Sequence, residues 1–184
     1  MRSALNVLVV LSYLELMSCG VGTDPTPTSG EADIQFSTNS DHGTGFSFSK
    51  GESIDLPNPN ETRADFLIEF QTSEDGTLQG LFLSTESLHP AFTLKAWPGT
   101  IDSAQTYFDK FTQITDTSFT DLALPLDGNQ VWGMKTLNNK YAKILIEVAD
   151  ATADTTDQQL VQFTGHLKMK WAWQPDGSRQ FSDF

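Results

Sequence analysis

The sequence predicts an all-β fold, an antiparallel sandwich or barrel-like single domain of short strands. Apolar and polar residues alternate with a period of two from about Gly43 onward, and side chains two residues apart lie on one face of a strand. Clusters of Asn, Asp, Gly and Pro separate these runs, for example at residues 74–76 and 175–177. Thirteen phenylalanines and four tryptophans supply apolar surface for a hydrophobic core.

The predicted strands follow one another at close spacing. The alternating or apolar runs lie around Phe46 and Phe48 and at residues 66–70, 78–84, 92–96, 131–137, 141–148 and 163–173. The runs at 131–137 and 141–148 are joined by Asn138, Asn139 and Lys140. Because asparagine tolerates a positive φ, we expect a tight hairpin at this junction.

One segment has helical rather than strand spacing. Tyr107, Phe108, Phe111 and Ile114 recur at intervals that place them on one face of a helix. Ser103 precedes them at a position suited to an N-cap, because its hydroxyl can accept a hydrogen bond from a free backbone N–H. β-branched threonines interrupt the segment, so the expected helix is short.

The N-terminus has the pattern of a secretory signal. Arg2 precedes a short apolar stretch, and small residues then lead to Cys19, which is the single cysteine of the chain. Residues 16–19 (Leu-Met-Ser-Cys) resemble a bacterial lipobox, in which the signal is removed before the cysteine and lipid is attached to it. An ordinary secretory signal with cleavage nearby is the alternative, and Glu15 inside the leader departs from both patterns.

These features divide the chain into three expected parts. Residues 1–18 are the lipoprotein signal peptide, residues 19–42 are the lipidated cysteine and a flexible Pro/Thr-rich tether, and residues 43–184 are the all-β domain. Residues 21–32 contain too little apolar surface to offset the entropy lost on ordering, so we interpret them as solvated. The expected location is the outer membrane or cell surface, through the lipid anchor.

The charge of the chain restricts its partners. The formal net charge is -13, from 24 acidic and 11 basic residues. Such a chain is repelled by phosphate backbones, and the sequence has no basic stripe that would offset the repulsion. We therefore expect no nucleic-acid partner, and we expect membrane attachment to depend on the lipid.

The sequence has no recognisable catalytic constellation. Its three histidines, at positions 42, 89 and 166, lie outside metal-binding spacings, and the chain has no G-x-S-x-G elbow and no phosphate-binding glycine loop. The aspartates at 150, 154 and 157 do not fit a calcium loop, because the glycine at its turn is missing. We expect these three aspartates in a solvated connector between two strands. We also expect that the protein is not an enzyme.

Candidate ligand-binding residues are aromatic or imidazole side chains. Trp171 and Trp173 share one strand face, where they either pack in the core or form an aromatic wall for a flat ligand such as a sugar ring or a porphyrin. Trp97 ends a strand and is expected to be exposed. His89, at a strand boundary, is the candidate metal ligand, because a neutral imidazole on a loop can bind iron. His166 is expected on the solvated face, with Lys168 and Lys170.

Four stretches of the chain together are similar to one known family. They are residues 46–52 (Phe-Ser-Phe-Ser-Lys-Gly-Glu), 64–70 (Ala-Asp-Phe-Leu-Ile-Glu-Phe), 131–144 (Val-Trp-Gly-Met-Lys-Thr-Leu-Asn-Asn-Lys-Tyr-Ala-Lys-Ile) and 171–178 (Trp-Ala-Trp-Gln-Pro-Asp-Gly-Ser). In this order they resemble the HmuY-like haem-binding lipoproteins, the haemophores of the Bacteroidetes type. The likeness frames most of residues 43–181, and the lipobox and tether agree with it.

The resemblance implies an all-β fold that captures haem through axial side chains, which are paired histidines or methionines in the family. One axial ligand of the histidine-using members falls at about Thr117–Thr120, where this chain has neither histidine nor methionine. The region from Phe70 to Phe119 aligns poorly with the family, so no ligand is transferred to it. His89 stays a candidate on its own chemistry.

The expected function is therefore that of a non-enzymatic envelope lipoprotein that captures haem or a related flat ligand for iron and haem acquisition. The partners that the resemblance implies are haem, haemoproteins and an outer-membrane receptor. A surface lipoprotein that binds glycans or a partner protein without haem is the alternative. A structural envelope protein without a small ligand is a third.

Overall fold

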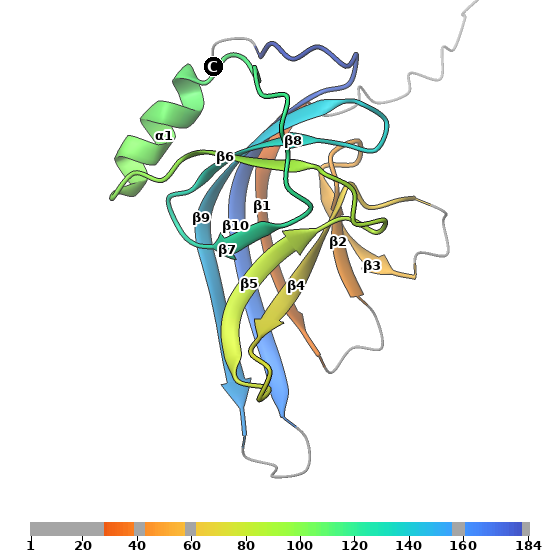
Figure 1. Cartoon of the computed structure of the whole chain (residues 1–184), viewed down its shortest axis with the longest axis vertical. Helices are drawn as coiled ribbons and strands as arrows, with labels where there is room; N and C mark the ends of the chain where they lie inside the picture. The colour runs from red at the N-terminus through yellow and green to blue at the C-terminus, as the bar shows by residue number, and fades with distance from the viewer. Residues whose placement is uncertain (1–27, 39–42, 58–61, 156–160, 182–184) are drawn as a thin grey trace, which may run out of the picture.

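The computed structural model describes residues 28–38, 43–57, 62–155 and 161–181. Two antiparallel five-stranded sheets form a sandwich, with one short helix outside it (Figure 1). Sheet A has the strand order β1-β10-β9-β8-β6, and sheet B has the order β3-β2-β4-β5-β7. The all-β antiparallel prediction is confirmed in its sandwich form.

The elements have the following bounds: β1 (Ser29–Ser37), β2 (Gly43–Ser47), β3 (Glu52–Leu56), β4 (Phe66–Thr72), β5 (Leu78–Ser84), β6 (Phe92–Ala96), α1 (Ile101–Lys110), β7 (Ala123–Leu126), β8 (Val131–Lys135), β9 (Tyr141–Asp154) and β10 (Gln162–Gln174). Strands β9 and β10 are the longest and pair along their full length, from Gln162 opposite Asp154 to Gln174 opposite Tyr141. Sheet A is built around this pair.

The predicted hairpin between β8 and β9 is confirmed. Lys135 lies opposite Tyr141, and the Thr136 backbone N–H donates to the carbonyl of Lys140 at 2.8 Å. Asn139 has a φ of 58°, in the left-handed region that asparagine tolerates better than most residues. The turn therefore fixes the register between the two central strands.

Strand β1 corrects the expected domain boundary. It begins at Ser29 and pairs with β10 from Ser29 opposite Ala172 to Ser37 opposite Thr164. The expectation that residues 19–42 form a flexible tether is therefore wrong for β1, although Ser29–Glu31 are exposed, and the domain begins before residue 43. The composition did not predict this strand because its first residues are polar on the outer side and small on the inner side. Gly30, for example, lies against the Trp171 ring.

Strands β3 and β7 were also not predicted. Both are short edge strands of sheet B, with five and four residues. Each has only one or two buried apolar side chains, so the period-two pattern is too short to read. The expected connector at Asp150 and Asp154 is likewise part of β9, and Asp157 lies outside the described residues.

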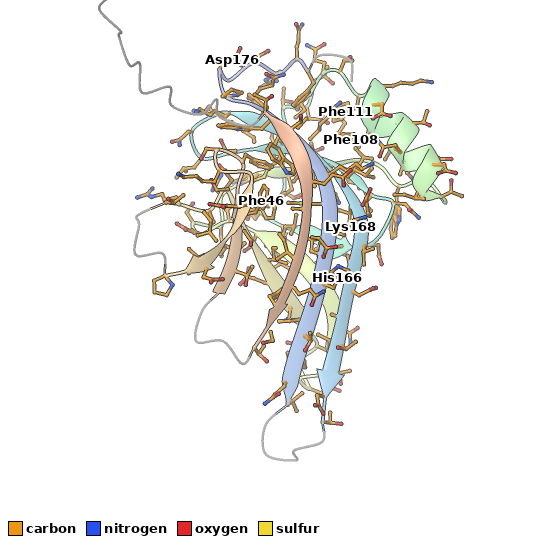
Figure 2. The ribbon with its side chains drawn as sticks, turned by 180° about the vertical axis from the view of Figure 1, so that it is seen from behind. Phe46, Phe108, Phe111, His166, Lys168 and Asp176 are labelled. Atoms are coloured by element: carbon orange, nitrogen blue, oxygen red, sulfur yellow. The ribbon has the colours of Figure 1, made fainter. Side chains whose placement is uncertain are left out.

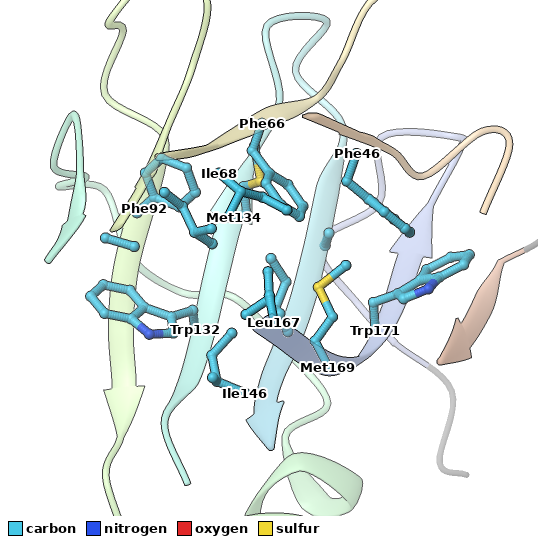
Figure 3. Close-up of a cluster of buried hydrophobic side chains, with 14 of the residues drawn as sticks. Phe46, Phe66, Ile68, Phe92, Trp132, Met134, Ile146, Leu167, Met169 and Trp171 are labelled. Carbon is cyan, nitrogen blue, oxygen red and sulfur yellow. The ribbon is translucent and has the colours of Figure 1, made fainter. Parts of the chain in front are cut away.

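The core lies between the two sheets (Figure 3). Its side chains come from alternating positions of β2, β4, β5, β8, β9 and β10, as the period-two pattern predicts. At one end, five aromatic residues form what we call the closed cluster: Phe46, Phe48, Phe66, Trp171 and Trp173. Ring centroids are 5.5 Å apart for Phe46 and Phe66, and 5.6 Å apart for Phe48 and Trp171.

Helix α1 covers the outer face of sheet A and creates a second apolar cluster. Phe108 and Ala104 of the helix pack with Leu145 of β9 and with Phe111 and Ile114, which follow the helix. The helix begins earlier than expected, because Thr100 rather than Ser103 is the N-cap and accepts from the Ser103 N–H. Ile114 is buried as predicted, but it lies beyond the helix end at Lys110.

Lys143 attaches the end of this helix to β9. Its side chain is fully buried, and Nζ donates to the carbonyls of Phe108 at 2.7 Å and Phe111 at 3.0 Å. The last carbonyls of a helix have no intrahelical partners and carry a partial negative charge. The lysine therefore satisfies both the hydrogen bonding and the electrostatics of the helix terminus.

The rest of the outer face of sheet A is polar, and Figure 2 shows His166 and Lys168 on it. His166, Lys168 and Lys170 alternate with the buried residues of β10, as the prediction of a solvated face requires. His166 Nε2 lies 2.9 Å from an Asp33 oxygen. Lys168 Nζ lies 3.0 Å from Glu147, and this hydrogen bond raises the pKa of the lysine. None of the described helices is long and apolar enough to cross a membrane.

Candidate functional site

The loop between β5 and β6 holds His89 in a defined turn. The Leu88 N–H donates to the carbonyl of Thr85 at 3.0 Å, and the His89 N–H donates to Thr85 Oγ1 at 3.2 Å. Leu88 has a φ of 47°, which is uncommon for a residue with a branched side chain, and its side chain is 61% exposed. A left-handed backbone conformation costs energy in a residue other than glycine, so it persists only where the surrounding contacts enforce it. Residues with such strained conformations often lie at ligand sites.

The two nitrogens of His89 have different environments. Nδ1 lies 3.1 Å from Thr85 Oγ1 and 3.0 Å from Ser87 Oγ, so either hydroxyl can fix the orientation of the ring. Nε2 is buried and has no hydrogen-bond partner in the described part of the chain. A proton on Nδ1, donated to one of the hydroxyls, leaves the lone pair on Nε2 for a metal or a donor.

A hollow of about 500 Å³ opens on one side of His89, and we call it the Phe119 hollow. Three segments form it: the β5–β6 loop, residues 117–119, and the turn between β8 and β9. Its lining residues are His89, Pro90, Thr117, Ser118, Phe119, Lys135, Thr136, Leu137 and Asn139. The size is within the range of small-molecule sites.

Backbone pairing places residues 117–119 beside His89. The N–H of Phe92 donates to the Thr120 carbonyl at 3.0 Å, and the N–H of Thr120 donates to the Phe92 carbonyl at 2.8 Å. This bridge fixes the end of the segment against the start of β6, three residues after His89. The structure therefore brings His89 and residues 117–119 into the lining of one hollow.

A second hollow, of about 240 Å³, lies on the other side of His89, and we call it the Arg63 hollow. Its described lining is Arg63, Ala64, Asp65, Thr85, Glu86, Ser87, His89, Leu137 and Asn138. His89 and Leu137 line both hollows and so form the wall between them. Burial raises the pKa of Asp65, and a 2.8 Å hydrogen bond from the Phe48 N–H opposes this shift.

The charges around His89 are mixed. Lys135 lines the Phe119 hollow, and Arg63, Asp65 and Glu86 line the Arg63 hollow. Lys135 and Arg63 are thus the basic groups that line the two hollows in the described part of the chain. Asp65 and Glu86 outnumber Arg63 in the Arg63 hollow, whereas no described carboxylate lines the Phe119 hollow. An acidic group is therefore complementary to the Phe119 hollow, whose lining also includes the apolar Phe119 and Leu137.

Trp171 and Trp173 do not belong to this site. They are 2% and 4% exposed, and both pack on Phe48 in the closed cluster. The core alternative is therefore the one that the structure shows, and the aromatic-wall alternative does not hold for these residues. Both indole N–H groups are buried without a partner among the described residues.

Trp97 is 53% exposed, as its position at the end of β6 predicted. It lines neither hollow of His89, so the structure does not bring these two candidates together. Cys19 and His42 lie outside the described residues. In the part of the chain that the structure describes, no three His, Cys, Asp or Glu residues come together as a metal site.

Sequence reasoning missed the residues that surround His89. Phe119, Lys135 and Leu137 come from segments distant in the chain, and they have no motif in common. The one available signal was the apolar Leu137 directly before two asparagines, which is 55% exposed in the structure.

The comparisons with known proteins give no independent identification. The chain matches no protein-family model, and a search of curated proteins finds no significant relative.

Proposed function

We propose that this protein is a lipid-anchored envelope protein that captures haem, or a related flat ring with acidic groups, in the Phe119 hollow. The observation that carries the proposal is the position of His89 beside residues 117–119 in one hollow of about 500 Å³. The resemblance to the HmuY-like family led us to expect haem, and the hollow has the size and lining for it.

His89 is the proposed axial ligand. Haem iron accepts a neutral imidazole nitrogen, and the second ring nitrogen of such ligands is normally held by a hydrogen bond. The Thr85 and Ser87 hydroxyls hold Nδ1 in this way, which directs Nε2 to the metal. Because Nε2 is covered, binding requires the β5–β6 loop to shift, and the left-handed turn at Leu88 is the place where it would move.

Residues 117–119, which line the hollow with His89, are Thr, Ser and Phe and would offer no strong ligand to haem iron. We therefore expect a single protein ligand and an open coordination position. Phe119 and Leu137 would contact the ring, and Lys135 would pair with a carboxylate of the ligand. Without a second axial bond, affinity depends more on these contacts than it does in proteins with paired ligands.

The proposed location rests on Cys19. Lipid on this residue would attach the chain to the outer membrane, and the residues between Cys19 and β1 would act as the tether. Haemoproteins are the proposed source of the ligand, and an outer-membrane receptor is its proposed acceptor. Replacing Cys19 by serine should move the chain from the membrane fraction to the soluble fraction, and unchanged partitioning would contradict the anchor.

A haem titration of the purified chain tests the ligand. We expect a saturable change of the Soret band with one equivalent of haem, and a five-coordinate spectrum. His89→Ala should weaken binding by about tenfold or more, which corresponds to at least about 1.4 kcal/mol. His166→Ala is the matched control, because His166 is held by Asp33 on the outer face of sheet A, away from both hollows.

A gain-of-ligand variant sharpens this test. Ser118→His adds an imidazole to the segment that lines the Phe119 hollow together with His89, and it should convert the bound haem to a six-coordinate species with tighter binding. No saturable binding by the unaltered chain would overturn the haem proposal. Binding that is equal in His89→Ala, together with an unchanged spectrum in Ser118→His, would place the ligand elsewhere.

The second candidate function is glycan or partner-protein binding without haem, and one observation favours it. Trp97 exposes 53% of its surface although it is a large aromatic residue, and aromatic faces stack on sugar rings. Binding of the chain on a glycan array, with loss in Trp97→Ala, would support this candidate. Glycan binding unchanged in Trp97→Ala would exclude this residue as the contact.

A further inference from the structure

The end of the sandwich that holds the closed cluster, which we call the closed end, also carries the two most exposed large hydrophobic side chains of the described residues. They are Leu88, in the β5–β6 loop, and Leu137, in the turn between β8 and β9. The two segments are neighbours, because the Lys135 N–H donates to the Ala91 carbonyl at 2.8 Å, and His89 and Leu137 line the same hollows. Two aliphatic side chains are therefore left in water on adjacent loops, which is unfavourable unless a partner covers them.

The chain enters the described domain at this same end. Thr28 precedes β1, and its carbonyl accepts a hydrogen bond from the Trp173 N–H at 2.7 Å. Trp173 belongs to the closed cluster, and the Lys140 ammonium of the β8–β9 turn lies 4.9 Å from the centre of its ring. Figure 1 shows β9 and β10 running from this end of the sandwich to the opposite one. The start of the domain thus lies beside the turn that carries Leu137.

The number of residues between Cys19 and Thr28 limits how far the closed end can lie from the proposed anchor. The two positions are nine residues apart, and a fully extended chain of that length spans at most about 32 Å. Strand β9 has 14 residues, so the sandwich is about 45 Å long in this direction. An inverted domain, with its opposite end on the membrane, would hold Thr28 farther away than the chain can reach.

The charges of the two ends favour the same orientation. At the opposite end, the β4–β5 turn, the end of β9 and the start of β10 contain Glu74, Asp75 and Asp154 but, among the described residues, no Lys or Arg. At the closed end both signs occur, and Lys135 and Lys140 flank the turn that carries Leu137. Because phospholipid surfaces are zwitterionic or anionic, they repel the acidic opposite end more than the closed end.

The β5–β6 loop presents Leu88 through a backbone conformation that does not require a leucine. Leu88 has a φ of 47°, and its N–H donates to the Thr85 carbonyl. Glycine or asparagine adopts this conformation at lower cost, so the advantage of leucine here lies in its side chain. The residues next to Leu88 and Leu137 are mostly polar and exposed. Such loops suit a lipid interface, where an apolar side chain can insert while its polar neighbours stay hydrated.

We infer that the closed end rests on a phospholipid surface, with Leu88 and Leu137 inserted among the lipid headgroups. The inference rests on the proposed lipid anchor at Cys19 and deepens it, because an anchor alone does not orient the domain. The net charge of -13 makes binding of the free chain weak, so contact depends on the anchor, which holds the leucines at high effective concentration beside the lipid. The segments that line the Phe119 hollow thereby lie at the membrane surface, where a ligand with an apolar body is concentrated.

The test couples the purified full chain to vesicles through the Cys19 thiol, which is the single thiol of the chain. The vesicles are phosphatidylcholine with brominated acyl chains and a trace of a maleimide-bearing lipid. Because bromine quenches an indole that it contacts, we compare Leu137→Trp with Val161→Trp, which replaces a similarly exposed side chain at the opposite end. On coupling, the added emission of Leu137→Trp should be lost, whereas that of Val161→Trp should be kept.

Hydrogen exchange of the unaltered chain gives a second measurement that adds no aromatic residue. Amides of residues 86–89 and 136–139 should exchange more slowly on the coupled vesicles, whereas those of residues 73–77 should not change. The slowing should disappear in the double variant Leu88→Gln, Leu137→Gln. It should persist in Val161→Gln, the matched control, which removes an exposed aliphatic side chain from the opposite end.

The inference is overturned if both added tryptophans are quenched equally, if neither is quenched, or if the slowing persists in the double glutamine variant. Slowing that appears without vesicles and grows with protein concentration would also overturn it, in favour of a second copy as the occupant. Coupling through maleimide needs neither the natural lipid nor haem. These outcomes are therefore separate from the partitioning of Cys19→Ser and from the haem titration, which test the proposed function.

Discussion

The sandwich has an aromatic cluster at each end, and the two clusters differ in how deeply they are buried. In the closed cluster, Phe46, Phe48 and Phe66 have no exposed surface. In the other, which we call the open cluster, Phe36, Phe70 and Phe163 are half-buried, and the ring centroids of Phe36 and Phe70 are 4.8 Å apart. The same residue type is therefore fully buried at one end and only partly buried at the other.

The described pairing of β2 with β4 covers three positions, from Thr44 opposite Ile68 to Phe46 opposite Phe66, and these positions lie at the closed end. The four predictions below test whether the two ends also differ in energy.

The largest contrast is expected from truncating one phenylalanine at each end. Phe48→Ala should lower the free energy of unfolding by about 3–5 kcal/mol, because the ring is fully buried against Phe46, Trp171 and Trp173. Phe163→Ala should lower it by only about 1 kcal/mol, since less apolar surface is removed from contact. Urea denaturation measures both, and equal losses would abolish the distinction between the clusters.

A second contrast comes from adding a methyl group to one glycine at each end. A Cβ on Gly45 would come 2.5 Å from the Ala64 Cβ and 3.0 Å from the Phe66 carbonyl oxygen, neither of which can move alone. Gly45→Ala should therefore destabilise the fold by about 2–3 kcal/mol. Gly165→Ala meets the half-buried Phe36 ring, which can turn outward, so about 1 kcal/mol is expected.

Thermal and urea unfolding of the two alanine variants would measure this contrast. A larger loss for Gly165→Ala would show that the Phe36 ring is as rigid as the closed end.

A third contrast lies within the core and concerns hydrogen bonds of tryptophan. The Trp132 indole N–H donates to Gln130 Oε1 at 3.0 Å, whereas the Trp173 N–H has no partner among the described residues. Trp132→Phe should therefore lower the free energy of unfolding by about 1 kcal/mol more than Trp173→Phe does. Both substitutions remove the same atoms, but only Trp132→Phe also removes a hydrogen bond. Denaturation at one temperature compares them directly, and an equal loss would imply that Trp173 has an unseen partner.

The smallest expected effect is a pH dependence at the closed end. Burial raises the pKa of Asp65 above its ordinary value of 3.8, so the folded state binds this proton more tightly than the unfolded chain does. Stability from this group is therefore present below the ordinary pKa and is lost as pH rises through the raised value.

Asp65→Asn keeps the acceptor for the Phe48 N–H and removes the titration. We expect the variant to lack the decline in stability that the unaltered chain shows on going from about pH 4 upward. Urea denaturation of both proteins across this range gives the difference. If the stability of Asp65→Asn declines by the same amount over this pH range, groups other than Asp65 cause the decline. If it declines more steeply than that of the unaltered chain, the pKa of Asp65 is lowered rather than raised by folding.

Several of these features could be predicted from the sequence alone. The alternation in residues 163–173 predicted both the core face of β10 and its charged face, because only two faces exist in a strand. The asparagines before Tyr141 predicted the hairpin, because its backbone needs a residue that tolerates positive φ. The aromatic spacing after Ser103 predicted a helix, although Thr100 is the residue that caps it.

The candidate site was predicted only in part. Sequence chemistry selected His89 and the exposed Trp97, but it could not place them in relation to each other. It also could not decide whether Trp171 and Trp173 pack in the core or line a ligand site, because the alternation pattern of one strand does not show whether a second sheet covers that face. Their burial depends on Phe46 and Phe48, which are more than a hundred residues away in the chain.

By itself, then, the sequence determined the local features of this protein: strand faces, turns, the acidic charge and the signal-like leader with Cys19. These depend on residues within a few positions of one another. Only the tertiary structure decided that β1 joins the domain, that His89 and residues 117–119 line one hollow, and that Trp171 and Trp173 are buried. Those outcomes depend on which distant strands pair and where the pairing stops, and backbone hydrogen bonds of this kind are nearly independent of side-chain identity.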